Sequence, residues 1–127
     1  MKMVWSTKEH ALKHYTEDIT IRRGQTVRDK LIIFLTEGPV VAVCLEGDEA
    51  VEVTRKIVGS TEPKSAPPGT IRGDFAHMSY TRADTTNRAL PNLIHASGNK
   101  EEAKTEVSLW FTNQELHSYK TVHDVFM

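Results

Sequence analysis

The chain has 127 residues, of which 39% are hydrophobic, and its 16 lysines and arginines nearly balance its 17 aspartates and glutamates. This length fits one domain over residues 1–127 that buries a core without disulfides or metals. A net charge of −1 excludes a global basic field, so we expect no nucleic-acid partner. No apolar run reaches the roughly 18 residues of a membrane span, so we expect no membrane partner.

The single cysteine, Cys44, lies in an apolar run where a buried, inert thiol is expected. It cannot form an internal disulfide, which suits a reducing compartment. The first residues also lack the long apolar core of a signal peptide. We therefore expect the protein in the cytoplasm.

The N-terminal third is predicted to contain a strand and two helices. Residues 2–6 have the pattern of a short strand. A helix follows over about 7–15, which Ser6 caps while Glu9 completes a capping box. Residues 16–25 are polar and predict a loop. A second helix ends at Gly38 and Pro39, and its helical spacing is set by Val27, Leu31, Phe34 and Leu35.

The middle of the chain is predicted to begin with a strand and a helix. Val40 to Leu45 is a continuous apolar run, typical of a strand buried on both faces. Residues 49–58 show helical spacing, with Gly59 as the C-cap. Residues 60–70 contain three prolines and predict an irregular loop. Residues 71–91 have no firm pattern apart from a turn at 84–87.

The C-terminal third is predicted to contain one more strand and one more helix. Leu93 and Ile94 are predicted to form an apolar strand that ends at His95, and a helix is predicted from about Lys100 to Phe111. The remaining tail is mixed in composition, and we expect it to pack on the surface.

His95 is the candidate reactive group. A neutral imidazole, with an ordinary pKa of ~6.5, keeps one lone pair that can attack an electrophile. Glu106 lies in the helical pattern that follows, and its carboxylate can hold the second ring nitrogen and fix the tautomer. The alternative is a histidine that is hydrogen-bonded for structural reasons at the end of a strand.

Other residue types fit an anion site or a metal site. Arg55 and Arg72 flank the proline-rich loop and could converge on a polyphosphate, with the Thr61 hydroxyl beside them. The alternative is that these arginines are ordinary solvated side chains. His10 and His14 share one face of a predicted helix and could bind a metal, but Ala11 stands where a zinc protease motif has glutamate.

Five successive blocks of the sequence carry a family resemblance. They resemble, in order, the signature blocks of nucleoside diphosphate kinases, and the resemblance covers nearly the whole chain. It implies an α/β fold of the ferredoxin-like α+β type, with helices packed on an antiparallel sheet. It also implies ping-pong transfer of the ATP γ-phosphate to nucleoside diphosphates through a phosphohistidine. The blocks are residues 38–43, 53–61, 68–75, 92–97 and 106–111.

The resemblance also assigns roles to individual residues. His95 matches the phosphorylated histidine, Glu106 the acidic residue that holds its ring, and Ser97 the serine that supports this pair. Mg²⁺ is expected on the phosphates of the nucleotide and not in a carboxylate cage. The residues that match nucleotide-binding positions are Tyr15, Arg55, Thr61, Arg72 and Asn92.

The sequence departs from the family pattern in three places. The first strand and helix of the family, with a Lys-Pro-Asp segment, have no counterpart in this chain. The base-stacking aromatic position falls near Val27, and the connection over residues 76–91 is longer than usual, which adds Arg82 and Arg88 near the site.

Two alternatives to the kinase hypothesis stay open from the sequence. One is a catalytically impaired remnant of the kinase fold that binds nucleotides or partner subunits. The other is a metal-binding module built on His10, His14 or His123. For assembly, the resemblance implies a homo-oligomer, either a hexamer or a tetramer.

Overall fold

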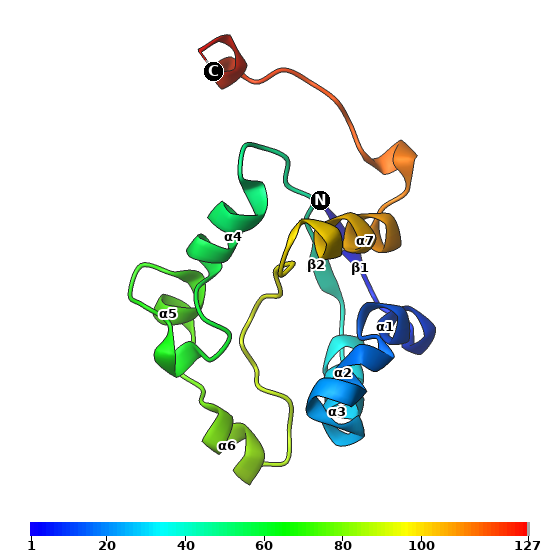
Figure 1. Cartoon of the computed structure of the whole chain (residues 1–127), viewed down its shortest axis with the longest axis vertical. Coiled ribbons are helices and arrows are strands. Elements are labelled where there is room, and N and C mark those ends of the chain that lie inside the picture. The colour runs from blue at the N-terminus through cyan, green and yellow to red at the C-terminus, as the bar shows by residue number, and fades with distance from the viewer. Residues whose placement is uncertain (127) are drawn as a thin grey trace.

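The computed structural model describes residues 1–126 (Figure 1). A small antiparallel sheet and several helices make up these residues, which confirms the predicted α+β class. No helix among them is both long and apolar enough to cross a bilayer. The elements in chain order are β1 (Lys2–Val4), α1 (Lys8–His14), α2 (Glu17–Arg23), α3 (Gln25–Thr36), β2 (Val40–Ala42), α4 (Ala50–Val58), η1 (Pro63–Ser65), α5 (Ile71–Phe75), α6 (Tyr80–Thr85), α7 (Lys100–Trp110), η2 (Asn113–Glu115) and η3 (Val122–Val125), where η marks a 3₁₀ helix.

The sheet is narrower and less buried than predicted. Strand β1 pairs antiparallel with β2 in the register Lys2 to Ala42, and β2 pairs with no other strand in the part of the chain that the structure describes. Val41 is 56% exposed and Val43 is 48% exposed, so the expectation of a strand over 40–45 buried on both faces is wrong. Residues 40–45 are apolar as expected, but no element within residues 1–126 covers both faces of this segment.

Local capping explains the start of α1, although not through the residue expected. Thr7, not Ser6, is the N-cap, and its hydroxyl accepts a hydrogen bond from the His10 amide at 3.2 Å. Ser6 is buried instead, and its Oγ lies 3.0 Å from His10 Nδ1. This correction moves the cap by one residue and leaves the predicted helix in place.

Helix α2 occupies most of the region where a loop was expected. Glu17 and Asp18 lie in its first turn and two arginines in its last, which suits the helix dipole. Gly24 separates it from α3 at φ +92°. Few apolar residues mark this helix, so hydrophobic periodicity could not reveal it. The long helix that follows, α3, was predicted from its spacing.

The region 60–91 folds as short helices. The turn expected at 84–87 is present where α6 ends, with Asn87 at φ +53°. Gly59 caps α4 as expected, at φ +89°, and a Cβ there would lie 2.5 Å from Thr70 Oγ1. Gly59 thus meets both a left-handed backbone and a close approach that only glycine allows.

The strand expected at Leu93–Ile94 does not form. This segment has no strand beside it within the described residues, and Leu93 takes a left-handed conformation at φ +70°. A β-strand needs a neighbour to complete its backbone hydrogen bonds, so apolar sequence alone does not create one. Side-chain hydrogen bonds hold the segment instead, because Arg72 donates to the carbonyls of Asn92 and Ile94.

Helix α7 begins and ends nearly as predicted, whereas the tail does not pack as expected. Asn99 caps α7 by accepting from the Glu102 amide at 2.8 Å, and Phe111 is its C-cap. Beyond it, Lys2 binds Glu115 at 2.8 Å and holds η2 against β1. The last residues extend away from the body (Figure 1), with Phe126 84% exposed.

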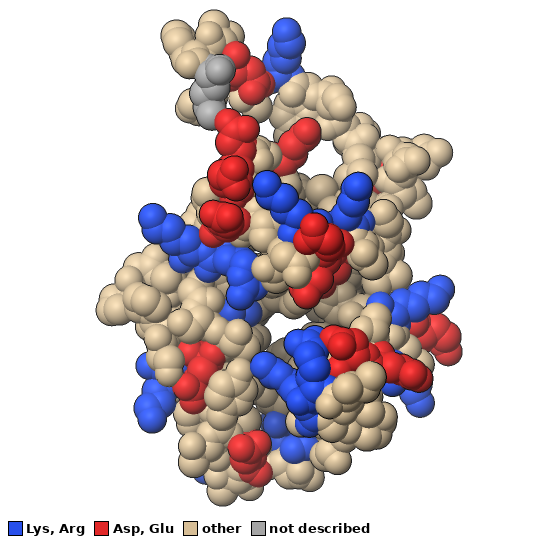
Figure 2. Space-filling view, viewed as in Figure 1, with Lys and Arg blue, Asp and Glu red and all other residues tan. Residues whose placement is uncertain are grey.

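The apolar core is small for a chain of this length. It consists of a few well-buried side chains, among them Ile32 of α3, Val58 of α4 and Phe111. Figure 2 shows the molecule hollowed near its centre, between β2 and the side formed by α4 and α5. A small core and a central hollow together leave many large apolar side chains in contact with solvent.

Candidate active site

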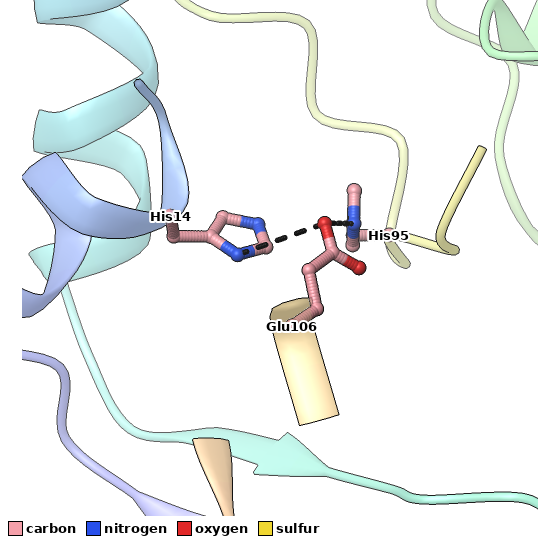
Figure 3. A group of neighbouring side chains, drawn as sticks. All are labelled: His14, His95 and Glu106. Atoms are coloured by element: carbon pink, nitrogen blue, oxygen red, sulfur yellow. Dashed lines mark hydrogen bonds and ion pairs between the residues drawn. The ribbon is translucent and has the colours of Figure 1, made fainter. Parts of the chain in front are cut away.

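His95, Glu106 and His14 lie together beside α7 (Figure 3). His95 comes from the segment that precedes α7, Glu106 from the middle of α7 and His14 from the last turn of α1. Arg28 of α3 donates from Nε to the Tyr15 carbonyl at 2.8 Å and ties down the end of α1. Three elements that lie far apart in sequence thus position one cluster.

The hydrogen bond between His95 and Glu106 fixes which ring nitrogen is free. His95 Nε2 lies 2.8 Å from Glu106 Oε1. An ionised carboxylate only accepts, so Nε2 carries the proton and donates it to Glu106. In the neutral ring, Nδ1 therefore keeps the lone pair. The His95 side chain is 47% exposed, so this nitrogen is accessible from solvent.

Glu106 is held in the ionised form by its two donors. Burial alone would raise the pKa of the Glu106 carboxyl, but hydrogen bonds from His95 and Ser97 outweigh burial and lower it below its usual value. Ser97 donates from Oγ to Oε2, so each carboxylate oxygen has its own partner. The arrangement is a nucleophile, an orienting acid and a hydroxyl that fixes the acid.

His14 is the member of the cluster that sequence reasoning did not place beside His95. Its ring packs edge-on against the His95 ring with centroids 4.7 Å apart, and its Nδ1 accepts from Trp110 Nε1 at 3.1 Å. Burial, assisted by the charge of His95, lowers the pKa of His14 to about 4. His14 is therefore neutral at pH 7. The sequence marked His14 by its position next to Tyr15 and by its spacing from His10, but neither signal placed it beside His95.

The predicted pair of His10 and His14 does not act as one ligand set. Both ring nitrogens of His10 are engaged, Nδ1 with Ser6 Oγ and Nε2 with the Leu109 carbonyl at 3.3 Å. The three-residue group with metal-binding geometry in the described part of the chain is instead His14, His95 and Glu106. Neither His10 nor His123 belongs to it.

The two predicted phosphate-binding arginines differ in their surroundings. Arg55 is exposed on α4, and its guanidinium lies 3.4 Å from the carbonyls of Ala96 and Ser97. Arg72 is buried on α5 and donates to the carbonyls of Asn92, Gly59 and Ile94. Burial and then the nearby charge of Arg55 lower the pKa of Arg72.

Three of the five N–H groups of the Arg72 guanidinium are used by carbonyls. Arg72 thus anchors the segment that carries His95, and two N–H groups remain for an anion. Its structural role was not foreseen from the sequence.

Thr61, Asn92 and Tyr15 lie around this centre. The Asn92 amide donates to the Thr61 carbonyl at 3.0 Å, which joins the proline-rich loop to the segment that carries His95. Tyr15 packs edge-on against His14 with centroids 4.7 Å apart, and burial followed by the charge of Glu106 raises its pKa. The structure therefore brings the predicted residues around a single region.

Comparison with known proteins identifies the family. The family model described as nucleoside diphosphate kinase matches residues 1–116. The chain belongs to the nucleoside diphosphate kinase family.

Curated nucleoside diphosphate kinases are similar to this chain over most of its length. The nucleoside diphosphate kinase of Borreliella burgdorferi is 42% identical over 120 residues, which are 94% of this chain and 72% of that protein. The enzyme of Pyrococcus horikoshii is 45% identical over 126 residues, 99% of this chain and 73% of that protein. The chain thus spans somewhat less than three quarters of the length of these kinases.

Solved structures of nucleoside diphosphate kinases match the fold. A transition-state mimic of the Borrelia burgdorferi enzyme with vanadate and ADP has a TM-score of 0.89 and 38% identity over 98% of this chain and 75% of that one. The Halobacterium salinarum enzyme in complex with CDP has a TM-score of 0.79 and 31% identity over 98% of this chain and 74% of that one. The similarity therefore extends to the arrangement of elements and supports the ferredoxin-like fold.

Proposed function

We propose that this chain is a nucleoside diphosphate kinase that uses His95 as its nucleophile. The observation that carries the proposal is the bond from His95 Nε2 to Glu106, which leaves Nδ1 free in a chain of this family. The related Borrelia enzyme was solved with ADP and vanadate, and the Halobacterium enzyme with CDP, so relatives bind nucleotides. No finding favours the impaired remnant.

The first half-reaction forms a phosphohistidine. His95 Nδ1 attacks the γ-phosphorus of ATP, the bond from that phosphorus to the β,γ-bridging oxygen breaks, and ADP leaves. The phosphorylated ring keeps its proton on Nε2, and Glu106 stabilises the positive charge that develops on the imidazole. Ser97 keeps Glu106 in position throughout.

The second half-reaction reverses the first with a different nucleotide. A terminal phosphate oxygen of the acceptor nucleoside diphosphate attacks the phosphorus, the N–P bond breaks, and the lone pair returns to Nδ1. Each half-reaction needs in-line positioning and charge neutralisation more than covalent chemistry. We assign charge neutralisation to Arg55 and to the remaining donors of Arg72. Thr61, Asn92 and Tyr15 contact the nucleotide.

The residues at the site fit a magnesium ion that is bound by the nucleotide itself. Mg²⁺ prefers oxygen ligands. Among the described residues, the group with metal-binding geometry offers the imidazoles of His14 and His95 and only one carboxylate, Glu106, which already accepts a hydrogen bond from His95. When bound to the phosphate oxygens, Mg²⁺ supplies charge neutralisation there. Arg55 and Arg72 supply the remaining charge neutralisation.

The proposal is tested by steady-state transfer from ATP to GDP with two matched variants. His95→Ala removes the nucleophile and is expected to reduce transfer to background. His77→Ala removes an exposed histidine in the loop before α6 and is expected to keep the rate within twofold. Equal activity of the two variants would assign the chemistry to another residue.

A further inference from the structure

Trp110 and Glu106 lie on the same face of α7, about one helical turn apart. Trp110 follows Glu106 by four residues, and this spacing places two side chains above one another on a helix. Both side chains approach His14 of α1. The indole Nε1 of Trp110 donates to His14 Nδ1 at 3.1 Å, and Glu106 Oε1 lies 3.9 Å from the same nitrogen. One ring nitrogen of His14 thus lies near both a donor and an acceptor.

The indole determines which nitrogen of His14 carries the proton. An indole N–H can only donate, so the hydrogen bond needs a lone pair on His14 Nδ1. Burial lowers the pKa of His14 to about 4, so the ring is neutral at pH 7 and its single N–H proton is on Nε2. In this tautomer His14 Nδ1 cannot donate to Glu106.

The other tautomer of His14 would compete with His95 for Glu106. Figure 3 shows the rings of His14 and His95 on opposite sides of the same carboxylate oxygen, Oε1. A proton on His14 Nδ1 would lie near that oxygen, and a small movement of the ring would complete a hydrogen bond. This second donor would share the charge that Glu106 offers to His95 and would draw the carboxylate toward α1.

We propose that Trp110 is a positioning residue for phosphate transfer, because it keeps His14 as an acceptor and so reserves Glu106 Oε1 for His95. Trp110 acts through His14 and Glu106 and not on the reacting atoms. The inference rests on the proposed function, because the transfer rate depends on Trp110 only if His95 is the nucleophile.

The surroundings of Trp110 hold its N–H in the required direction. The ring of His10 packs edge-on against the indole, with centroids 4.3 Å apart. His10 is itself fixed at both ring nitrogens, because Nδ1 lies 3.0 Å from Ser6 Oγ and Nε2 lies 3.3 Å from the Leu109 carbonyl. The indole is therefore packed against a ring that cannot turn freely, and its N–H stays directed at His14 Nδ1.

Nitrogen NMR of the chain with isotope-labelled histidine measures the tautomer, because a ring nitrogen that carries a proton and one that carries a lone pair have well-separated shifts. The His14→Gln variant assigns the signals of His14. At pH 7 we expect the proton of His14 on Nε2 in the wild-type chain. In Trp110→Phe, which keeps a ring but lacks the N–H, we expect part of it on Nδ1. A proton on Nδ1 in the wild-type chain would overturn the proposal, as would an unchanged tautomer in Trp110→Phe.

The rate at which ATP phosphorylates His95 in a single turnover measures the functional effect. Trp110→Phe should slow this step about five- to tenfold, as expected for one lost hydrogen bond. Trp5→Phe is the matched control, because Trp5 Nε1 also donates at 3.1 Å, to the Thr36 carbonyl, and should change the rate by less than about twofold. Circular dichroism checks that both variants fold. Equal rates for the two variants would contradict the proposal.

A double variant separates positioning from support of the fold. His14→Phe keeps an aromatic ring beside His95 but has no proton to donate to Glu106. Added to Trp110→Phe, it should raise the rate about threefold or more above that of Trp110→Phe alone, because the competing donor is gone. A double variant that is equally slow or slower would show that the indole only supports packing, and would overturn the proposal.

Failure of the proposed function can be distinguished from failure of this inference. A wild-type chain that takes no phosphate on His95 would contradict the proposed function and, with it, a role of Trp110 in transfer. A chain that is phosphorylated on His95 but shows the same His14 tautomer with and without the indole N–H would contradict this inference alone.

Discussion

Glu106 connects two residues of the proposed mechanism, because one oxygen accepts from His95 and the other from Ser97. We expect Glu106→Gln to keep the shape of the site but to remove the charge that stabilises a positive imidazole. The transfer rate should fall by about 10²- to 10⁴-fold, as for other orienting carboxylates. The check is kcat in the ATP to GDP assay.

Glu101→Gln is the control for that experiment, since Glu101 is exposed in the first turn of the same helix. It should leave kcat within twofold. A Glu106→Gln enzyme that is as active as this control would show that the carboxylate charge has no part in transfer.

His14 makes the stability of the protein depend on pH. Its pKa is about 4 in the folded chain and 6.5 as the ordinary value, so between these values the unfolded chain binds a proton that the folded chain does not. The contribution is full above pH 6.5 and is lost as pH falls toward 4, by about 3 kcal/mol in total.

We therefore expect urea midpoints to fall from pH 7 to pH 4.5, and His14→Gln to flatten this dependence. His123→Gln, which alters an exposed histidine in the tail, should keep the wild-type slope. A slope that is unchanged in His14→Gln would mean that another group carries the proton.

At the residue scale, the sequence predicted the contact of His95 and Ser97 with Glu106 better than it predicted the surroundings of these residues. Glu106 follows His95 by 11 residues and Ser97 by 9 residues, and direct hydrogen bonds join it to both. His14 is far away in sequence, and only the packing of α1 on α7 brings it to His95. The carbonyl bonds of Arg72 were equally hidden, because they depend on where an irregular segment runs.

At the scale of elements, Arg72 holds the segment that carries His95. Arg72→Lys replaces a planar fork with one ammonium group that cannot reach the carbonyls of Asn92, Gly59 and Ile94 together. We expect a loss of about 1–3 kcal/mol in the free energy of unfolding. Chemical denaturation measures it.

Arg82→Lys, on α6 and exposed, is the control and should change the free energy of unfolding by less than about 0.5 kcal/mol. If Arg72→Lys were equally mild, the carbonyl bonds would not be what holds the segment.

Two glycines with positive φ differ in the space that a side chain would meet. Gly59 at φ +89° and Gly69 at φ +85° are both left-handed, but a Cβ at Gly59 would meet Thr70 Oγ1 at 2.5 Å while one at Gly69 meets nothing within 4 Å. Gly69→Ala should cost about 1 kcal/mol and Gly59→Ala more, about 2–4 kcal/mol. Thermal unfolding of the pair checks the order, and equal costs would contradict it.

Helices were predicted more successfully than strands, and the reason is physical. A helix completes its hydrogen bonds within one segment, so the spacing in α3, α4 and α7 was sufficient. A strand depends on a neighbour, and residues 43–45 and 93–97 lack one within the described chain. Helix α2 was missed because it carries little apolar periodicity.

At the scale of the whole molecule, exposed apolar side chains point to assembly. Ile21 is 85% exposed and Phe75 is 76% exposed, which is costly for a lone chain in water. We expect a homo-oligomer, a hexamer or a tetramer, with the mass of six or four chains in light scattering. A single chain at micromolar concentration would contradict this prediction.

The measurement that tests the central proposal most directly follows the phosphate itself. The purified chain is incubated with γ-labelled ATP and Mg²⁺, the modified residue is located by mass spectrometry, and the labelled protein is then given GDP. We predict acid-labile phosphate on His95 that moves to GDP. A folded chain that binds nucleotide but carries no label on His95, or that carries label which GDP does not remove, would contradict the account.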